Sequence, residues 1–203
     1  MGLQARDEGR AKAELRRRML AQRAAVPASA RARAAERAAG ALLTAPAVRQ
    51  ARVVLLHHPI GAELPLGPLP ARLRARGVTL ALPRGVGPGG AIELRRWDEG
   101  APLPPDAFGV PAPGSGAPRI APGDVDVVVV PAVAVDAQGW RLGRGGGHYD
   151  RLLPRLERAW RVGWVLAVQR VEQLPHAAHD QRLDAVVSEQ GLQHFPRAPE
   201  DGR

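Results

Sequence analysis

The sequence predicts an α/β protein, a single three-layer, doubly wound (Rossmann-like) domain around a central, mostly parallel sheet. Short β-branched runs alternate with helix-like segments, and the run at 125–130 is apolar on both faces, as a strand covered by helices on each side should be. The composition, 45% hydrophobic and 24% charged, is that of an ordinary globular protein. We place the domain at residues 1–196 and a C-terminal tail at 197–203.

The first part of the chain predicts two helices. Residues 10–43 are rich in Ala, Arg, Glu and Leu and are interrupted only before Pro27, so we expect one helix on each side of that break, both packed against the sheet. Lys12 and Arg16 are four residues apart in the first helix. Their side chains therefore share one face of it.

Five β-branched runs bounded by turn residues predict the strands of the sheet. They span residues 52–56, 78–82, 125–130, 161–166 and 183–187. Further helices are expected at 66–76 and 149–160. The Gly- and Pro-rich stretch 85–123 predicts a long surface excursion over the sheet edge that holds a short strand at 92–97 and forms part of a pocket wall.

Composition excludes several classes of protein. There is no cysteine, which rules out disulfides, thiolate zinc sites and a cysteine nucleophile. The first fifty residues contain no apolar block of the kind a signal peptide needs, and the apolar stretch 127–135 is too short to span a bilayer. We therefore expect a cytoplasmic protein without a membrane partner.

The net charge of +9 is concentrated near the N-terminus, where Met1 to Arg37 hold ten Lys or Arg against four Asp or Glu. Such a segment could be a nucleic-acid arm or simply a solvated helix. Only 3% of residues are aromatic and no stacking or groove-reading motif is present, so we expect no nucleic-acid partner. Lys12 is the one lysine among 29 basic residues, and an ammonium group is well suited to holding a phosphate.

The clearest motif is a glycine-rich turn between an apolar strand and the helix expected from residue 149. It reads Arg141-Leu142-Gly143-Arg144-Gly145-Gly146-Gly147-His148-Tyr149-Asp150. Glycines let backbone N–H groups curl around phosphate oxygens, and a helix that begins directly afterwards directs its positive end to the same place. The two arginines would add mobile cations. The alternative is that this glycine-rich turn is only a flexible connection between the strand and the helix.

This motif resembles the Arg-Leu-Gly-Arg-Gly-x-Gly-x-Tyr-Asp signature of the 5-formyltetrahydrofolate cyclo-ligases, also called methenyltetrahydrofolate synthetases. The resemblance extends from Lys12 to Glu189 through blocks at 12–16, Glu63, 108–111, Gln169, 174–175, 179–180 and 183–184. It implies an enzyme that uses ATP and Mg²⁺ to close 5-formyltetrahydrofolate into 5,10-methenyltetrahydrofolate, releasing ADP and phosphate. In that reaction the γ-phosphoryl group moves to the formyl oxygen, a neighbouring nitrogen attacks the formyl carbon, and phosphate leaves.

The resemblance also implies roles for individual residues. ATP-binding residues would be Lys12, Arg16, Arg141, Leu142, Gly143, Arg144, Gly145, Gly146, Gly147, His148 and Tyr149. Substrate-binding residues would be His58, Glu63, Arg144, His148 and Tyr149, with Arg144 and Tyr149 catalytic. Asp150 and Asp180 would bind Mg²⁺, which prefers carboxylate and water oxygens. We expect a monomer whose partners are 5-formyltetrahydrofolate and ATP.

Three positions depart from the pattern of these cyclo-ligases. Gly146 stands where a lysine is usual, His148 where the first of two tyrosines is usual, and Ala112 where an acid is usual. They motivate the alternative that the protein is a divergent relative that acts on or binds another ligand.

Several side chains carry a second interpretation. His176 and His179 could bind a transition metal, or they could line a loop near the nucleotide or lie in solvent. Glu63 could be an acid at the start of a helix, and Tyr149 a packed aromatic of a first helical turn. Trp97 and Trp140 are candidates for covering the pocket, although a lone tryptophan is usually part of a core or rim.

Overall fold

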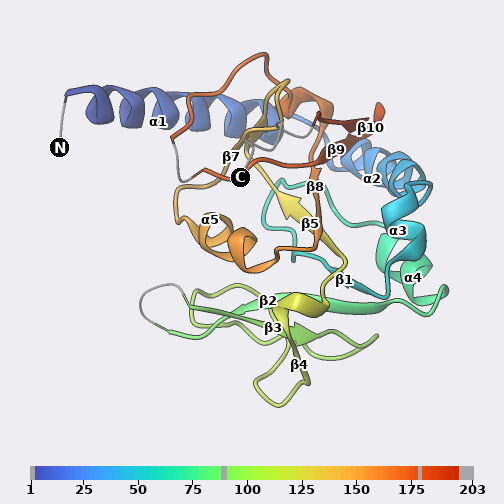
Figure 1. Ribbon diagram of the computed structural model, residues 1–203. Helices are drawn as coiled ribbons and strands as arrows, with labels where there is room; N and C mark the ends of the chain where they lie inside the picture. The colour runs from blue at the N-terminus through green and yellow to red at the C-terminus, as the bar shows by residue number, and fades with distance from the viewer. Residues whose placement is uncertain (1–2, 88–90, 178–179, 197–203) are drawn as a thin grey trace, which may run out of the picture.

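The computed structural model describes residues 3–87, 91–177 and 180–196 (Figure 1). Within them, eight strands form one sheet in the order β10-β9-β8-β5-β1-β2-β3-β4. The C-terminal tail expected at 197–203 and His179 lie outside the described residues.

That sheet is mostly parallel, as predicted. Its strands are β1 (Val53–Leu55), β2 (Thr79–Gly85), β3 (Ile92–Arg96), β4 (Arg119–Ile120), β5 (Val127–Pro131), β8 (Trp160–Trp164), β9 (Ala185–Ser188) and β10 (Gly191–His194). Strands β9, β8, β5, β1 and β2 run parallel, and β10, β3 and β4 are antiparallel additions at the two edges. Each predicted strand is present, including the short strand expected at 92–97.

The chain reverses its direction of travel across the sheet at β1. From β1 it proceeds to β2 on one side, and it later returns to β5 on the other side of β1 before adding β8 and β9. The junction between β1 and β5 is therefore the topological switch point, where doubly wound sheets bind their ligands at the carboxyl ends of the strands.

Helices cover both faces of the sheet, which gives the three expected layers. Alternate residues of β5 enter opposite cores: Val127 and Val129 face one, and Val128 and Val130 face the other. The first core is covered by α2 (Ala28–Leu42), α3 (Pro46–Gln50) and α4 (Leu69–Arg74). The second is covered by α5 (His148–Leu152) and the 3₁₀ turn η2 (Leu153–Arg155). Figure 1 shows α5 on the opposite side of the sheet from α2, α3 and α4.

Two helices are shorter than the sequence predicts. The helix expected at 149–160 is α5, continued only by η2, because Pro154 has no N–H to extend the helical hydrogen-bond ladder. The helix expected at 66–76 is α4, which begins between two prolines and is followed by Gly77 at φ +78°. Positive φ is typical of the residue that ends a helix.

The prediction that both N-terminal helices pack against the sheet is wrong for the first. Helix α1 (Leu3–Ala24) packs through Met19 on a separate two-stranded hairpin, β6 (Ala134–Val135) and β7 (Arg141–Leu142). Its apolar stripe is narrow, and a narrow stripe suits a small hairpin better than a broad sheet. Neither α1 nor any other helix among the described residues is long and apolar enough to cross a bilayer.

Candidate active site

A pocket with a cavity of about 160 Å³ opens at the carboxyl ends of β1, β2 and β5, beside the switch point. Its apolar walls are Ile60, Pro83, Ile92, Phe108, Val110, Pro131, Ala132 and Val133. Its polar residues are His57, His58, Glu63, Asp106, Arg141, Arg144, His148, Tyr149 and Asp150, and Gly85, Gly143, Gly146 and Gly147 complete the lining. An apolar cleft with a few converging polar groups is the usual form of a small-molecule site.

The glycine loop borders this pocket, carried there by the β6–β7 hairpin. Gly145 at φ +103° and Gly147 at φ +64° adopt backbone conformations that side chains rarely tolerate, which explains why this loop needs glycine. Gly147 directly precedes α5, as the motif predicts. However, α5 has only five residues, so its positive end contributes less than the longer helix expected from the sequence.

Helix α1 contacts the loop through Arg16, and Lys12, one turn earlier in the helix, pairs with Asp180. Arg16 donates from Nε to the carbonyl oxygen of Gly143 at 2.8 Å, and its guanidinium carbon would lie 3.8 Å from a Cβ at Gly145. Lys12 Nζ lies 2.6 Å from Oδ2 of Asp180, which also accepts the backbone N–H of Ala177. Lys12, Arg16 and Asp180 therefore gather beside the loop.

Not every expected site residue lines the pocket. Five of them lie outside its lining: Lys12, Arg16, Leu142, Gly145 and Asp180. The other expected site residues line the pocket. Leu142 is buried beneath α1 in the cluster that contains Met19. Of the ATP-binding residues expected on α1, Arg16 meets the glycine loop and Lys12 meets Asp180, both outside the cavity in which the expected substrate-binding residues converge.

The prediction that Arg141 is a mobile cation is wrong. Its side chain is 3% exposed, and Nη2 donates to Oδ1 of Asp150 at 2.5 Å. The guanidinium carbon also lies 5.6 Å from the centroid of the Tyr149 ring. Burial lowers the pKa of Arg141, and Asp150, Tyr149 and Asp180 oppose that shift. Arg141 is a fixed part of the wall, ion-paired with one of the two carboxylates expected to bind metal.

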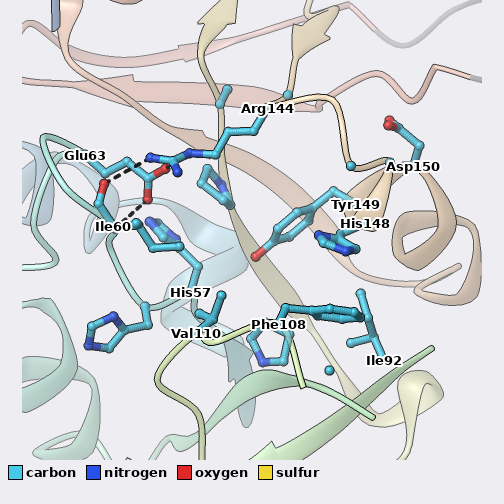
Figure 2. A pocket seen from close by; sticks show the side chains of 18 of the residues that line it. His57, Ile60, Glu63, Ile92, Phe108, Val110, Arg144, His148, Tyr149 and Asp150 are labelled. Atoms are coloured by element: carbon cyan, nitrogen blue, oxygen red, sulfur yellow. Dashed lines mark hydrogen bonds and ion pairs between the residues drawn. The ribbon is translucent and has the colours of Figure 1, made fainter. Parts of the chain in front are cut away.

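Glu63 lies at the centre of a buried polar cluster at one end of the pocket. Its Oε2 accepts the backbone N–H of Ile60 at 2.9 Å, and its Oε1 accepts Nε–H of Arg144 at 3.1 Å. Arg144 also donates to the carbonyl oxygen of Ile60 at 3.3 Å. A second guanidinium, that of Arg23 on α1, lies 3.8 Å from Oε1. Figure 2 shows Arg144 reaching across the pocket from the glycine loop to Glu63.

Three polar atoms in the wall have no hydrogen-bond partner within the described part of the chain. They are the hydroxyl of Tyr149, Nδ1 of His58 and Nε of Arg141. Burial raises the pKa of Tyr149, with a smaller contribution from Glu63, so its phenol stays protonated at neutral pH. Figure 2 shows that hydroxyl directed into the middle of the pocket. Buried polar atoms without partners are rare, and in a cavity they suggest a ligand that would bond them.

His57 is also held neutral. Burial lowers its pKa to about 4, an effect that Glu63 and the backbone of Val129 partly oppose. Its Nδ1 lies 3.4 Å from the carbonyl oxygen of Val129, which assigns the ring proton to that nitrogen. His57 therefore adds a polar but uncharged edge to the pocket.

Phe108 and His148 close the cavity on the side opposite Glu63. Their rings stack with centroids 4.7 Å apart (Figure 2). Asp106 holds the Phe108 loop because its carboxylate accepts backbone N–H groups of Gly85, Phe108 and Val110. The excursion expected over 85–123 therefore forms part of the pocket wall, as predicted.

Both tryptophans proposed as covers lie elsewhere. Trp97 packs against the core beneath the guanidinium of Arg74, and Trp140 stacks on His176 with ring centroids 4.0 Å apart.

Among the described residues no three His, Cys, Asp or Glu side chains form a metal cluster. His176 is thus a stacking partner of a tryptophan in this structure. Ala112 is fully buried and does not line the pocket.

Sequence reasoning missed Arg23, His57 and Asp106. Arg23 is 3% exposed although it lies in a helix full of solvated arginines. A signal was available, because Arg23 follows the buried Met19 by four residues and so shares its face of α1. The sequence around Asp106 and His57 contains no comparable pattern that would predict their position in the pocket wall.

The fold and the site together define an α/β protein with a small-molecule pocket at the switch point of a doubly wound sheet, bordered by a cationic glycine loop. A sequence model of the "5-formyltetrahydrofolate cyclo-ligase family" matches residues 8–189. The chain belongs to this family of enzymes.

Individual relatives agree with this assignment. The 5-formyltetrahydrofolate cyclo-ligase of Mycolicibacterium smegmatis is 33% identical over 189 residues, covering 88% of this chain and 94% of that protein. The solved 5,10-methenyltetrahydrofolate synthetase of Aquifex aeolicus superposes with a TM-score of 0.80 at 35% identity, covering 95% and 94% of the two chains. The synthetase of Mycoplasma pneumoniae has a TM-score of 0.72 at 19% identity, covering 88% and 98%, and shows the shared fold.

Proposed function

We propose that the protein is an ATP-dependent 5-formyltetrahydrofolate cyclo-ligase that forms 5,10-methenyltetrahydrofolate, ADP and phosphate. Membership of the family supports the reaction. The observation that carries the proposal for this chain is the convergence of Glu63, Arg144 and Tyr149 on one apolar cavity, although Glu63 and Arg144 are 81 positions apart in the sequence.

The cavity suits the flat ring system of a reduced folate. Phe108, Ile92 and Val110 provide apolar contact for the ring, and Glu63 can accept hydrogen bonds from ring N–H and amino groups. His58 and His148 offer further polar contacts at the edge of the cavity. These contacts would hold the formyl group near Arg144 and Tyr149.

The glycine loop and α1 suit the phosphates of ATP. The loop supplies backbone N–H groups, and Arg16 and Lys12 approach it from the helix. Phosphoryl transfer depends on positioning and on neutralisation of charge more than on acid or base strength. Lys12 and Arg16 would supply that neutralisation next to the loop.

Asp150 and Asp180 fit a role in holding Mg²⁺. Both offer carboxylate oxygens, the ligands that Mg²⁺ prefers, and both contribute to the electrostatic environment of Arg141, which places them near the same guanidinium. Asp150 is paired with Arg141 and Asp180 with Lys12. When bound, the ion would offset negative charge on the ATP phosphates.

Arg144 and Tyr149 are the residues we assign to the chemical steps. The γ-phosphoryl group passes from ATP to the formyl oxygen, a folate nitrogen then attacks the formyl carbon, and the C–O bond breaks to release phosphate. The Arg144 guanidinium would stabilise charge on the transferred phosphoryl group. The protonated phenol of Tyr149 would donate a hydrogen bond at the formyl oxygen.

The direct test mixes purified protein with ATP, Mg²⁺ and 5-formyltetrahydrofolate and follows the near-ultraviolet absorbance of the methenyl product. We expect product only when all three are present, and Tyr149→Phe and Glu63→Gln should reduce the rate. Absence of turnover at high enzyme concentration would reject the proposal. Turnover of another compound in a panel of reduced folates would favour the divergent alternative.

The remaining expectations stay predictions. We propose a monomer that works in the cytoplasm with no nucleic-acid or membrane partner. Three of the cations on α1, Lys12, Arg16 and Arg23, are directed at groups of the protein itself, which supports an enzymatic rather than a nucleic-acid role for that helix.

A further inference from the structure

Two guanidiniums face the same carboxylate oxygen of Glu63, and they differ in almost every other respect. Arg144 comes from the glycine loop, is 47% exposed and donates directly to Oε1 at 3.1 Å. Arg23 comes from α1, is 3% exposed and lies 3.8 Å from Oε1. One partner is therefore free to move into solvent, and the other is held inside the protein.

The proposed function requires Arg144 to change partners. Glu63 must accept N–H groups of the folate at the oxygen that Arg144 now contacts, and Arg144 is needed at the phosphoryl group. If Arg144 were the sole counter-charge, its departure would leave a carboxylate that is 8% exposed without a cation. Such a buried, uncompensated charge is strongly unfavourable.

We infer that Arg23 is a positioning residue, the fixed counter-charge that keeps Glu63 ionised and correctly placed while Arg144 is exchanged for the folate. This inference rests on the proposed function. Arg23 would not touch the substrate, because it is absent from the pocket wall. It would act through the carboxylate of Glu63.

The surroundings of Arg23 support this role. Its Nε and Nη1 atoms are buried and make no hydrogen bond within the described part of the chain, so no other acceptor competes with Glu63 for them. Burial lowers the pKa of Arg23, Glu63 opposes the shift, and the charge of Arg144 adds to it. Departure of Arg144 therefore removes a repulsive charge from the surroundings of Arg23.

The backbone that carries Glu63 is also fixed independently of Arg144. Glu63 Oε2 accepts the N–H of Ile60, and Nε1 of Trp164 donates to the carbonyl oxygens of Leu64 and Pro65 at 3.1 and 3.2 Å. Only Oε1 is left to exchange partners. Arg23 lies beside that oxygen, which places it to hold the carboxylate during the exchange.

The test compares Arg23→Gln, Arg23→Lys and Arg17→Gln with the wild type. Arg17 is a matched control on the same helix, where it pairs with Glu14 at the surface. Calorimetry would measure the Kd for 5-formyltetrahydrofolate and, separately, for a non-hydrolysable ATP analogue. We expect Arg23→Gln to raise the folate Kd and KM about ten-fold or more, with the nucleotide Kd within about three-fold of wild type, and Arg23→Lys to recover part of the loss.

A double-mutant cycle separates action through Glu63 from a general loss of packing. In the Glu63→Gln background, Arg23→Gln should change the folate Kd by less than about three-fold, because the charge it serves is gone. This comparison also carries the test if Arg23→Gln does not fold alone, since the double variant buries no unpaired charge. An undiminished effect in the Glu63→Gln background would overturn the inference.

Arg144→Gln tests the exchange itself. In this background Arg23→Gln should raise the folate Kd at least as much as it does in the wild type, because Arg144 no longer shares Oε1 with Arg23. An unchanged folate Kd on adding Arg23→Gln would mean that Arg23 does not hold Glu63. If wild-type protein binds no reduced folate, the proposed function fails; if it does and Arg23→Gln binds equally well, only the inference fails.

Discussion

Arg16 donates a 2.8 Å hydrogen bond from α1 to the carbonyl oxygen of Gly143, so a helix from the start of the chain braces the glycine loop. The same guanidinium lies beside Gly145, where an added Cβ would be 3.8 Å from its central carbon. The shape of the loop therefore depends on α1 as well as on its own glycines.

Replacing Arg16 should weaken nucleotide binding. Arg16→Met removes the charged group that donates to the Gly143 carbonyl. We expect the binding free energy of an ATP analogue to weaken by on the order of 2 kcal/mol, so that its Kd rises more than ten-fold. Calorimetry with the purified variant would measure it. Arg17→Met, one residue along and exposed, is the control, and equal affinities for both variants would contradict the role of Arg16.

Lys12→Ala should raise the apparent KM for ATP while leaving the fold intact. Lys12 and Asp180 form a 2.6 Å ion pair in which each side chain is about 14% exposed, so the ammonium is partly shielded from water and is positioned beside the loop. Initial rates at varied ATP, together with circular dichroism, would test this. A wild-type KM for ATP in the folded variant would remove Lys12 from the nucleotide site.

Gly85→Ala should destabilise the protein and disturb the pocket. A methyl group at Gly85 would overlap the ring of Phe108 and would lie 2.9 Å from Oδ2 of Asp106, which accepts the N–H of Gly85. We expect the free energy of unfolding in urea to fall by about 1–3 kcal/mol, as in other overpacked sites. Gly114→Ala, which meets no atom within 4 Å, should unfold like the wild type.

His57 should make the folded state less stable in acid. Its pKa is about 4 when folded and 6.5 when unfolded, so between these values the unfolded chain binds the extra proton. The contribution of His57 to stability is complete above pH 6.5 and is lost as the pH falls towards 4, at about 1.4 kcal/mol for each pH unit.

Urea unfolding of His57→Gln and wild type from pH 4 to pH 7 would measure that slope. The variant should show a shallower dependence on pH across this window. The exposed His194 provides the control, since His194→Gln should retain the wild-type slope. Parallel curves for wild type and His57→Gln would show that His57 is not held neutral.

The strands and the loop could be predicted because their signals are local. The run at 125–130 is apolar on both faces, and it became the central strand β5. The order of strands could not be predicted, since it depends on pairing between segments far apart in sequence. The β6–β7 hairpin was missed because each of its strands has only two residues.

The site residues likewise divide into those that local sequence predicts and those that depend on distant segments. The glycine loop is contiguous, so its residues were recognised together, and the family resemblance added Glu63 from a distant segment. The burial of Arg141 was not predictable, because it follows from the hairpin that turns this residue towards Asp150. Arg23 was missed because its charge concealed the helical spacing that buries it.

Glu63 follows β1, whereas Arg144 follows the β6–β7 hairpin that comes after β5, so β1 and β5 must pair before these two residues can face each other. A refolding chain with only part of its sheet assembled therefore has nowhere to bind folate. Added ligand should leave the rate of folding unchanged and slow only the rate at which the finished molecule unfolds.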